Sequence, residues 1–281
     1  MADQTGNVQQ QVEQAFQAAR QGDFGRIGGL PRLGPEVAPL LAPYLHDRQL
    51  EIRREAVAVL GVLGGAQALP LLLEALRDPD ADLRERAARA LYSQYEPTAL
   101  ARDKAAGVAL RASAAAGNRS AACLLLLGYF PGVETEQSLH IVLKDVGAEH
   151  TKLTDSGPLV SVALPTQMAL SRLGDRSARA ALLRTIDQAS SAEAEFFLAV
   201  LRDIDSPTVL HAIKALLGDN REIAGGVPSG AEPRRRLRDA AVDAFVKRLS
   251  LHIDFELSAS RRYSDAQIAE VRQRIDSQLP Q

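Results

Sequence analysis

Two stretches of the chain repeat one another: Leu45-His46-Asp47 followed by Glu51-Ile52-Arg53-Arg54-Glu55-Ala56, and Leu76-Arg77-Asp78 followed by Asp82-Leu83-Arg84-Glu85-Arg86-Ala87. Corresponding positions are 31 residues apart, as from 47 to 78 and from 53 to 84. A fixed period of this size indicates one supersecondary unit that is used repeatedly and buries its apolar face against the next copy. The sequence therefore predicts a repeat array.

Each unit is predicted to contain two helices, because its apolar residues recur at helical spacing on one side. The first helices carry Val37, Leu40, Leu41, Tyr44 and Leu45, then Leu69, Leu72, Leu73 and Leu76. The second helices carry Ile52, Ala56, Val59, Leu60 and Leu63, then Leu83, Ala87, Ala90 and Leu91. A turn at Asp78-Pro79-Asp80 separates the two helices of a unit.

The pattern continues more weakly toward the C-terminus. Further helical pairs are predicted at 98–116 with 119–127, 134–144 with 158–173, 177–188 with 192–204, and from 207 to 249. The fold class is therefore all-α, an α-solenoid of about six helical pairs. We expect a single domain, 1–281, with an N-terminal cap at 1–34, repeats at 35–249 and a C-terminal cap at 250–281. Residues 252–257 alternate in polarity, which predicts a short extended stretch.

The repeated motif resembles that of a known family. Ile52-Arg53 and Leu83-Arg84 begin the pattern Arg-x-x-Ala-x-x-x-Leu, with an aspartate six residues before the arginine. This resembles HEAT repeats of the short, roughly 30-residue bacterial type, closely over 35–94 and loosely over 98–249. The resemblance implies ladders of hydrogen bonds between the aspartate and the arginine of neighbouring repeats. Glu232 and Arg238 occupy these two positions in the last unit.

Composition and charge disfavour several classes of protein. Lys and Arg number 33 against 35 Asp and Glu, without the basic excess of a protein that wraps nucleic acid. The single cysteine, Cys123, excludes an intramolecular disulfide, and its apolar neighbours predict a core position. No stretch reaches the roughly 18 apolar residues of a membrane span. The N-terminus lacks the pattern of a signal peptide, which favours a cytoplasmic protein, although a periplasmic protein without its leader would look the same.

Residues that carry chemistry do not form a recognisable motif. The sequence has no phosphate-binding glycine loop, no H-E-x-x-H and no G-x-S-x-G. Its five histidines lie apart, with no two at the i, i+3 or i+4 spacing of a helical metal site. We expect no catalytic residue, no cofactor and no metal site, and therefore a protein that is not an enzyme.

Two long interruptions of the repeat, at 145–158 and 217–233, are candidate binding loops. The second contains Gly226 and Ser229 and runs into Arg234, Arg235 and Arg236. These arginines are either a solvated helix start or a patch for carboxylates or phosphates. Because cations are unfavourable at a helix N-terminus, an acidic partner would stabilise them there.

The outward side of the second helices is the other candidate surface. Arg54, Glu85, Arg89 and Tyr92 are expected to lie there. Mixed charge with an occasional tyrosine is typical of a protein-binding surface. It is equally typical of any solvated helix face.

The leading interpretation is a non-catalytic scaffold or inhibitor that binds another protein, one with an acidic patch, since extended surfaces are the main use of such arrays. A bacterial immunity protein that neutralises a toxin is one role within this class. The alternative is enzymatic, because short HEAT-like repeats also occur in bilin lyases and in DNA glycosylases. The glycosylases imply a basic groove with aromatic side chains, which this composition disfavours.

Overall fold

The computed structural model describes residues 2–223, 234–258 and 260–279, with only the backbone at 2–5. The chain folds as two compact units, Met1–Val142 and Leu143–Gln281. The expected single domain, with caps at 1–34 and 250–281, stays a prediction.

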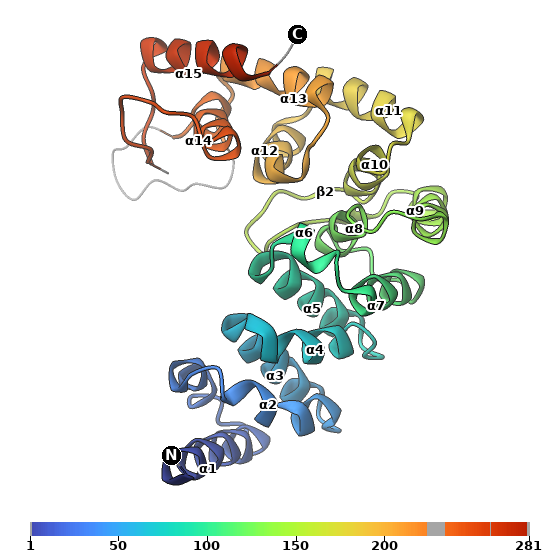
Figure 1. Cartoon of the computed structure of the whole chain (residues 1–281), viewed down its shortest axis with the longest axis vertical. Coiled ribbons are helices and arrows are strands. Elements are labelled where there is room, and N and C mark those ends of the chain that lie inside the picture. Colours follow the sequence, from blue (N-terminus) through green and yellow to red (C-terminus); the bar gives the residue numbers. More distant parts are fainter. Residues whose placement is uncertain (1, 224–233, 259, 280–281) are drawn as a thin grey trace. The chain divides into compact units, whose positions relative to one another are not determined.

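The first unit is built from helices that pack as successive pairs (Figure 1). They are α1 (Ala2–Arg20), η1 (Ile27–Leu33), α2 (Val37–Leu40), η2 (Ala42–His46), α3 (Leu50–Leu63), α4 (Gly65–Ala75), α5 (Ala81–Gln94), α6 (Pro97–Leu100), α7 (Lys104–Ala115), α8 (Ala121–Leu127) and α9 (Val133–Asp145), whose last turn crosses the boundary. The first helices α2, α4 and α7 contact one another in order, and so do the second helices α3, α5 and α8. The unit therefore has two layers, one from each helix of the pair.

The second unit is also helical. It contains α10 (Ala163–Arg172), α11 (Arg176–Asp187), α12 (Ser191–Ala199), η3 (Leu201–Asp203), α13 (Pro207–Ile213), η4 (Lys214–Gly218), α14 (Leu237–Leu249) and α15 (Asp265–Gln278). Here α11 packs on α13, and α12 packs on α14, so the two layers recur. The all-α helical repeat predicted from the sequence is confirmed.

Three local features differ from the prediction. The first helix of the first pair is divided into α2 and the 3-10 helix η2, because Pro39 and Pro43 lack the N–H that a continuous helix needs. The interruption after α9 contains two short strands, β1 (His150–Thr151) and β2 (Val160–Ser161), paired antiparallel. Residues 252–257 form no strand, since the chain bends at 254–255, although Ile253, Phe255 and Leu257 are half-buried.

Small residues allow the second helices of the first unit to approach closely. A Cβ placed on Gly61 of α3 would lie 3.1 Å from the Cβ of Ala90 of α5. Ile52, Leu60, Ala87 and Leu91 are wholly buried nearby. The interface between these repeats is therefore close-packed, and a methyl group added at Gly61 would require the two helices to shift slightly.

A ladder of charged hydrogen bonds joins the repeats on the side where their turns lie. Arg53 binds the carboxylate of Asp78 through both Nε (2.8 Å) and Nη2 (3.2 Å), and its Nη1 donates to the carbonyl of Asp47 (3.0 Å). Arg20 of α1 binds the carboxylate of Asp47 in the same way, at 3.0 Å and 2.6 Å. Each aspartate thus pairs with the arginine of the preceding element, as the resemblance implied for neighbouring repeats.

The ladder changes at the third pair. Asn118 makes the turn there, accepting the N–H of Ser120 at 3.1 Å, and its Nδ2 donates to the carbonyl of Arg84 at 3.2 Å. Arg84 itself donates to the carbonyl of Ala116 at 2.8 Å instead of to a carboxylate. Leu124 stands six residues after Asn118, where the two preceding units have arginine. Every residue of α8 is buried, so a charge at this position would be costly.

In the last unit Asp219 makes the equivalent turn, accepting the N–H of Arg221 at 2.9 Å. Its carbonyl accepts the N–H of Arg238 at 2.9 Å, which closes the base of the second interruption. Glu232, which the sequence pattern places in the aspartate position, lies outside the described residues.

The ladder predicts a marked loss of stability in Asp78→Ala. This change leaves the half-buried Arg53 without its carboxylate, and we expect the free energy of unfolding to fall by roughly 1–3 kcal/mol. Asp82→Ala is the matched control, since this exposed carboxylate in the same repeat pairs only at the surface. Its effect should stay within about 0.5 kcal/mol. Equal effects in urea unfolding would show that the Arg53–Asp78 pair contributes nothing special.

Candidate functional site

The outward side of α3 and α5 is a surface of charged side chains that the core does not use. We define the α3–α5 face by the following residues. They are Glu51, Arg54, Glu55, Ala58 and Val62 of α3, and Asp82, Glu85, Arg86, Arg89 and Ser93 of α5. All are exposed or half-exposed, and Val62 shows 64% of its area to solvent. The expected positions of Arg54, Glu85 and Arg89 on this surface agree with the structure.

Ion pairs fix the side chains of this face. Asp82 forms an ion pair with Arg54 of the neighbouring repeat, whose Nε lies 2.9 Å away, and it accepts a hydrogen bond from Arg86 Nε of its own helix (2.8 Å). Glu85 pairs with Arg89 one turn later on α5. Such pairs add little stability at a surface, but they limit the rotamers of long side chains. The face is therefore partly ordered before any partner arrives.

Tyr92 does not belong to this face, and the expectation that it points outward is wrong. It is 7% exposed. The reason is that α5 contacts α3 and α4 and also α8, so it buries a second stripe beside the first. Arg84, Ala88 and Tyr92, spaced at i, i+4 and i+8, form that second stripe.

The structure gives two of the three arginines before α14 internal partners. Arg236 binds both carboxylate oxygens of Asp239, through Nε (2.8 Å) and Nη2 (2.9 Å), and also donates to the carbonyl of Tyr263 (3.1 Å). Arg235 pairs with Asp243 and donates to the carbonyl of Asp239 at 2.9 Å. The argument that these cations are unfavourable without an external partner is therefore corrected for Arg235 and Arg236. Only Arg234 is exposed.

Downstream residues complete the surface around Arg234. Arg262 donates through Nε to the carbonyl of Arg234 (2.7 Å) and through Nη2 to Glu222 (2.9 Å). Its neighbour Arg261 is exposed. We call Arg234, Arg261 and Arg262 the basic surface. The adjacent pair Arg261-Arg262 is a signal that sequence reasoning passed over, because only the fold brings it beside Arg234.

The second interruption is closed at its base. Ile223 N–H donates to the carbonyl of Arg235 (2.9 Å), and Leu237 N–H donates to the carbonyl of Arg221 (2.8 Å). Gly226 and Ser229, the loop residues predicted to contact a partner, lie outside the described residues. Their role stays a prediction.

Asp239 is a fully buried carboxylate at the start of α14. Burial alone would raise its pKa. The hydrogen bonds from Arg236 and from the backbone N–H groups of Tyr263 (2.9 Å) and Arg236 (3.0 Å) outweigh that effect, so its pKa lies below the ordinary value. The carboxylate is therefore ionised at neutral pH and holds the arginine beside it.

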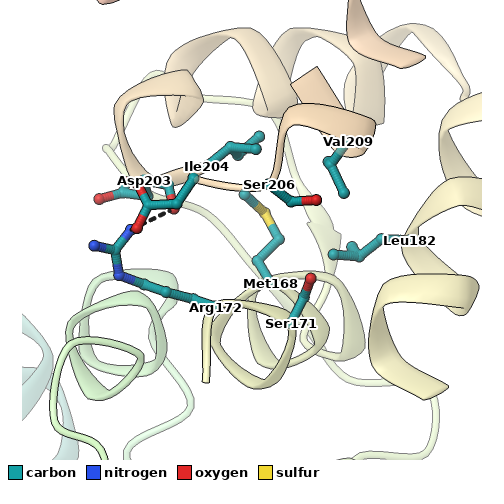
Figure 2. A pocket seen from close by; sticks show the side chains of 9 residues that line it. Met168, Ser171, Arg172, Leu182, Asp203, Ile204, Ser206 and Val209 are labelled. Carbon is teal, nitrogen blue, oxygen red and sulfur yellow. Dashed lines mark hydrogen bonds and ion pairs between the residues drawn. The ribbon is translucent and has the colours of Figure 1, made fainter. Parts of the chain in front are cut away.

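Two hollows of the second unit differ in size. The smaller is a cavity of about 20 Å³ lined by Met168, Leu182 and Val209, with Arg172 along one side; Figure 2 shows these side chains. This volume admits about one water molecule. An open groove of about 600 Å³ lies between α11 and α13–η4. It is large enough for a ligand, but its cations Lys214 and Arg221 pair with Asp276 and Asp219.

Among the described residues, the side chains that commonly bind metals do not gather into a cluster. In the described ranges no three His, Cys, Asp or Glu side chains lie close enough together to hold a metal ion. Cys123 is wholly buried, as predicted, and burial raises the pKa of its thiol to about 12. Of the helices in the described part, none is long and apolar enough to cross a membrane.

The comparisons with known proteins agree with this geometry. Residues 27–92 match the family model of HEAT repeats. That segment holds α3, α4 and nearly all of α5, and so most of the ladder and of the α3–α5 face. The recognition of HEAT-like repeats from the sequence is therefore confirmed. A search of curated proteins finds no relative that matches the chain.

The geometry around α14 predicts that alanine substitutions at Arg234 and at Arg236 lower the free energy of unfolding by different amounts. Arg236→Ala leaves the buried Asp239 without its side-chain partner and should lower the free energy of unfolding by about 3 kcal/mol. Arg234→Ala is the matched control and should stay within about 0.5 kcal/mol of wild type. Denaturant unfolding measures both. Equal, small effects would mean that Arg236 is as solvated as Arg234.

The lowered pKa of Asp239 also predicts a pH dependence. A carboxyl whose pKa is lower in the folded state stabilises the protein above its unfolded pKa, about 3.9. That contribution is lost as the pH falls through the folded value. We expect Asp239→Asn to reduce stability at pH 7 and to flatten the loss of stability below pH ~4. An unchanged slope of unfolding free energy against pH would contradict this assignment.

Proposed function

We propose that this chain is a non-catalytic scaffold or inhibitor that binds another protein along the α3–α5 face. HEAT repeats are helical scaffolds that typically mediate protein interactions, and this face lies within the matched repeats. The observation that carries the proposal is that these charged side chains, including Arg54 and Arg89, stand outside the core and outside the ladder. Stability of the array does not require them.

The pairing of the charges indicates the kind of contact. Arg54, Asp82 and Arg86 form one cross-repeat cluster, and Glu85 and Arg89 form a second. Because both signs are present, a partner of complementary mixed charge gains from each cluster, whereas a polyanion meets the acidic groups as well. Val62 and Ala58 add apolar area at one end of the same helix. Mixed charge with a small apolar area suits a protein surface better than nucleic acid.

The proposed partner also has an acidic patch. The basic surface supports this part of the proposal, because Arg234 and Arg261 have no acidic partner of their own among the described residues. Exposed charges such as those of the basic surface mainly speed association with a partner of opposite charge and make the association rate sensitive to salt. Gly226 and Ser229 belong to the same part of the proposal.

The more specific functions differ in the molecule that stays bound to the chain during purification. Neutralisation of a toxin, as by a bacterial immunity protein, requires that the captured protein lose a measurable activity on binding. A bilin lyase would retain a chromophore, and a glycosylase-like protein would retain nucleic acid. Absorption of the purified chain in the visible range and at 260 nm separates these classes before any partner is known.

The test compares two double variants as bait. Arg54→Glu with Arg89→Glu reverses charge on the α3–α5 face, whereas Arg77→Glu with Arg102→Glu makes the same change at exposed turn positions, after α4 and α6, of the same unit. We expect the wild type and the Arg77/Arg102 control variant to capture the same protein. The Arg54/Arg89 variant should bind that protein at least about tenfold more weakly, a loss of about 1.4 kcal/mol in binding free energy. Quantitative mass spectrometry and then titration measure this. Equal capture by all three baits places the site elsewhere.

A further inference from the structure

The second helix α14 can be aligned with α3 and α5 through the ladder arginine. Arg238 lies 3.0 Å from the carboxylate of Asp265, at the start of the following helix, as Arg53 binds Asp78 of the following repeat. The residues around it agree, since Leu237, Ala241 and Phe245 are wholly buried like Ile52, Ala56 and Leu60. In this register, Asp239 corresponds to Arg54 and Glu85, and Asp243 corresponds to Ala58 and Arg89.

These equivalent positions are open in the first unit and closed in α14. The side chains of Arg54 and Glu85 are each 34% exposed, whereas that of Asp239 is 0% exposed. Asp243 is likewise buried, while Ala58 is exposed. The outward face of α14 is therefore covered, and part of what covers it is the chain's own described residues 251–258 and 260–264, which we call the cover.

The cover is fastened through two neighbouring residues: Arg262, which pairs with Glu222 and donates to the carbonyl of Arg234, and Tyr263. The hydroxyl of Tyr263 donates to Asp243 (2.6 Å), and its backbone N–H donates to Asp239 (2.9 Å). At the other end, Leu251 N–H bonds the carbonyl of Val246 at 3.0 Å, where Ser250 ends α14 in the left-handed conformation. Between these ends the described backbone has one bond to the rest of the unit, from Asp254 N–H to Glu270 at 3.3 Å.

The cover also packs on itself. The rings of Phe255 and Tyr263 lie 5.3 Å apart, and Ser258 N–H donates to the Tyr263 hydroxyl at 2.9 Å. His252, Asp254 and Glu256 are exposed. A surface loop that carries its own contacts in this way can move as a unit, as Ω-loops do.

We propose that the cover is a displaceable, autoinhibitory segment that occupies the partner-binding face of α14. This inference rests on the proposed use of second-helix faces for binding. Opening would break the surface pair between Arg262 and Glu222. It would strand no buried charge, because Arg236 stays paired with Asp239 and Arg235 with Asp243. The partner that replaces the cover presents an extended segment with a hydroxyl and a backbone N–H, the two donors that Tyr263 now supplies to the carboxylates.

The experiment measures how the cover opens in the whole chain, with no partner present. The reporter is the amide of Tyr263, followed by NMR hydrogen exchange, and the amides of Phe245 and Val246 report on α14. We expect the Tyr263 amide to exchange through a local opening that low, non-denaturing urea leaves unchanged, because little surface is exposed. The α14 amides should exchange only through a urea-sensitive opening.

Tyr263→Phe removes the hydroxyl and keeps the ring, so the unit should still fold. The backbone amide at position 263 should then exchange about tenfold faster, the change expected for one lost hydrogen bond to a charged group. Trypsin cleavage after Arg261 should rise in parallel, while exchange in α14 stays the same. Tyr95→Phe is the matched control, since its hydroxyl donates to the carbonyl of Gly65 in the first unit (2.7 Å), and it should leave the cover unaffected.

Two results would overturn the proposal. Exchange of Tyr263 together with α14, at the same rate and urea dependence, would make the cover a permanent part of the fold. An equal acceleration of α14 and the cover in Tyr263→Phe would do the same. Because no partner is used, failure here leaves the α3–α5 binding test intact, and failure of that test leaves the opening of the cover measurable.

Discussion

The hydrogen bonds between Arg53 and Asp78 set the register of the first unit. An arginine that is only 14% exposed must satisfy its donors within the protein, and here it reaches the carboxylate of the next repeat and the carbonyl of Asp47 in its own. The two bonds are compatible at only one spacing of adjacent pairs. That spacing brings Gly61 against Ala90. The side chains on the outward side of α3 and α5 take no part in the ladder.

Much of the first unit could be predicted from sequence because its main interactions join residues of the same repeat or of adjacent repeats. The 31-residue offset and the helical spacing of the apolar residues indicated the helices and the turn, and the resemblance to HEAT repeats implied the ladder. The second buried stripe, which includes Tyr92, could not be seen in the same way. It depends on α8, a helix that is apolar on every side and whose packing partners its own pattern does not reveal.

The site near α14 shows the opposite case. The run of arginines before this helix is conspicuous in the sequence, but the groups that pair with Arg235 and Arg236 include Asp243 on the next turns and Tyr263 far downstream. Charge counted along the chain therefore overstates charge at the surface. Arg261 and Arg262 lie far from Arg234 in the sequence, and only the fold brings this pair beside Arg234, through the bond from Arg262 to its carbonyl.

Whether the outward face of a second helix is open or covered depends on whether the paired charges on that face are exposed to water or buried. On α5 Glu85 and Arg89 are paired with each other and remain in contact with water, so a partner can add contacts without first removing any. On α14 the carboxylates of Asp239 and Asp243 are buried, and the arginines before the helix balance them. A buried charge that is already balanced keeps its partner when the segment above it moves away. The covered face can therefore be exposed at the cost of the bonds that Arg262 and Tyr263 make, while the ion pairs of Asp239 and Asp243 beneath stay in place.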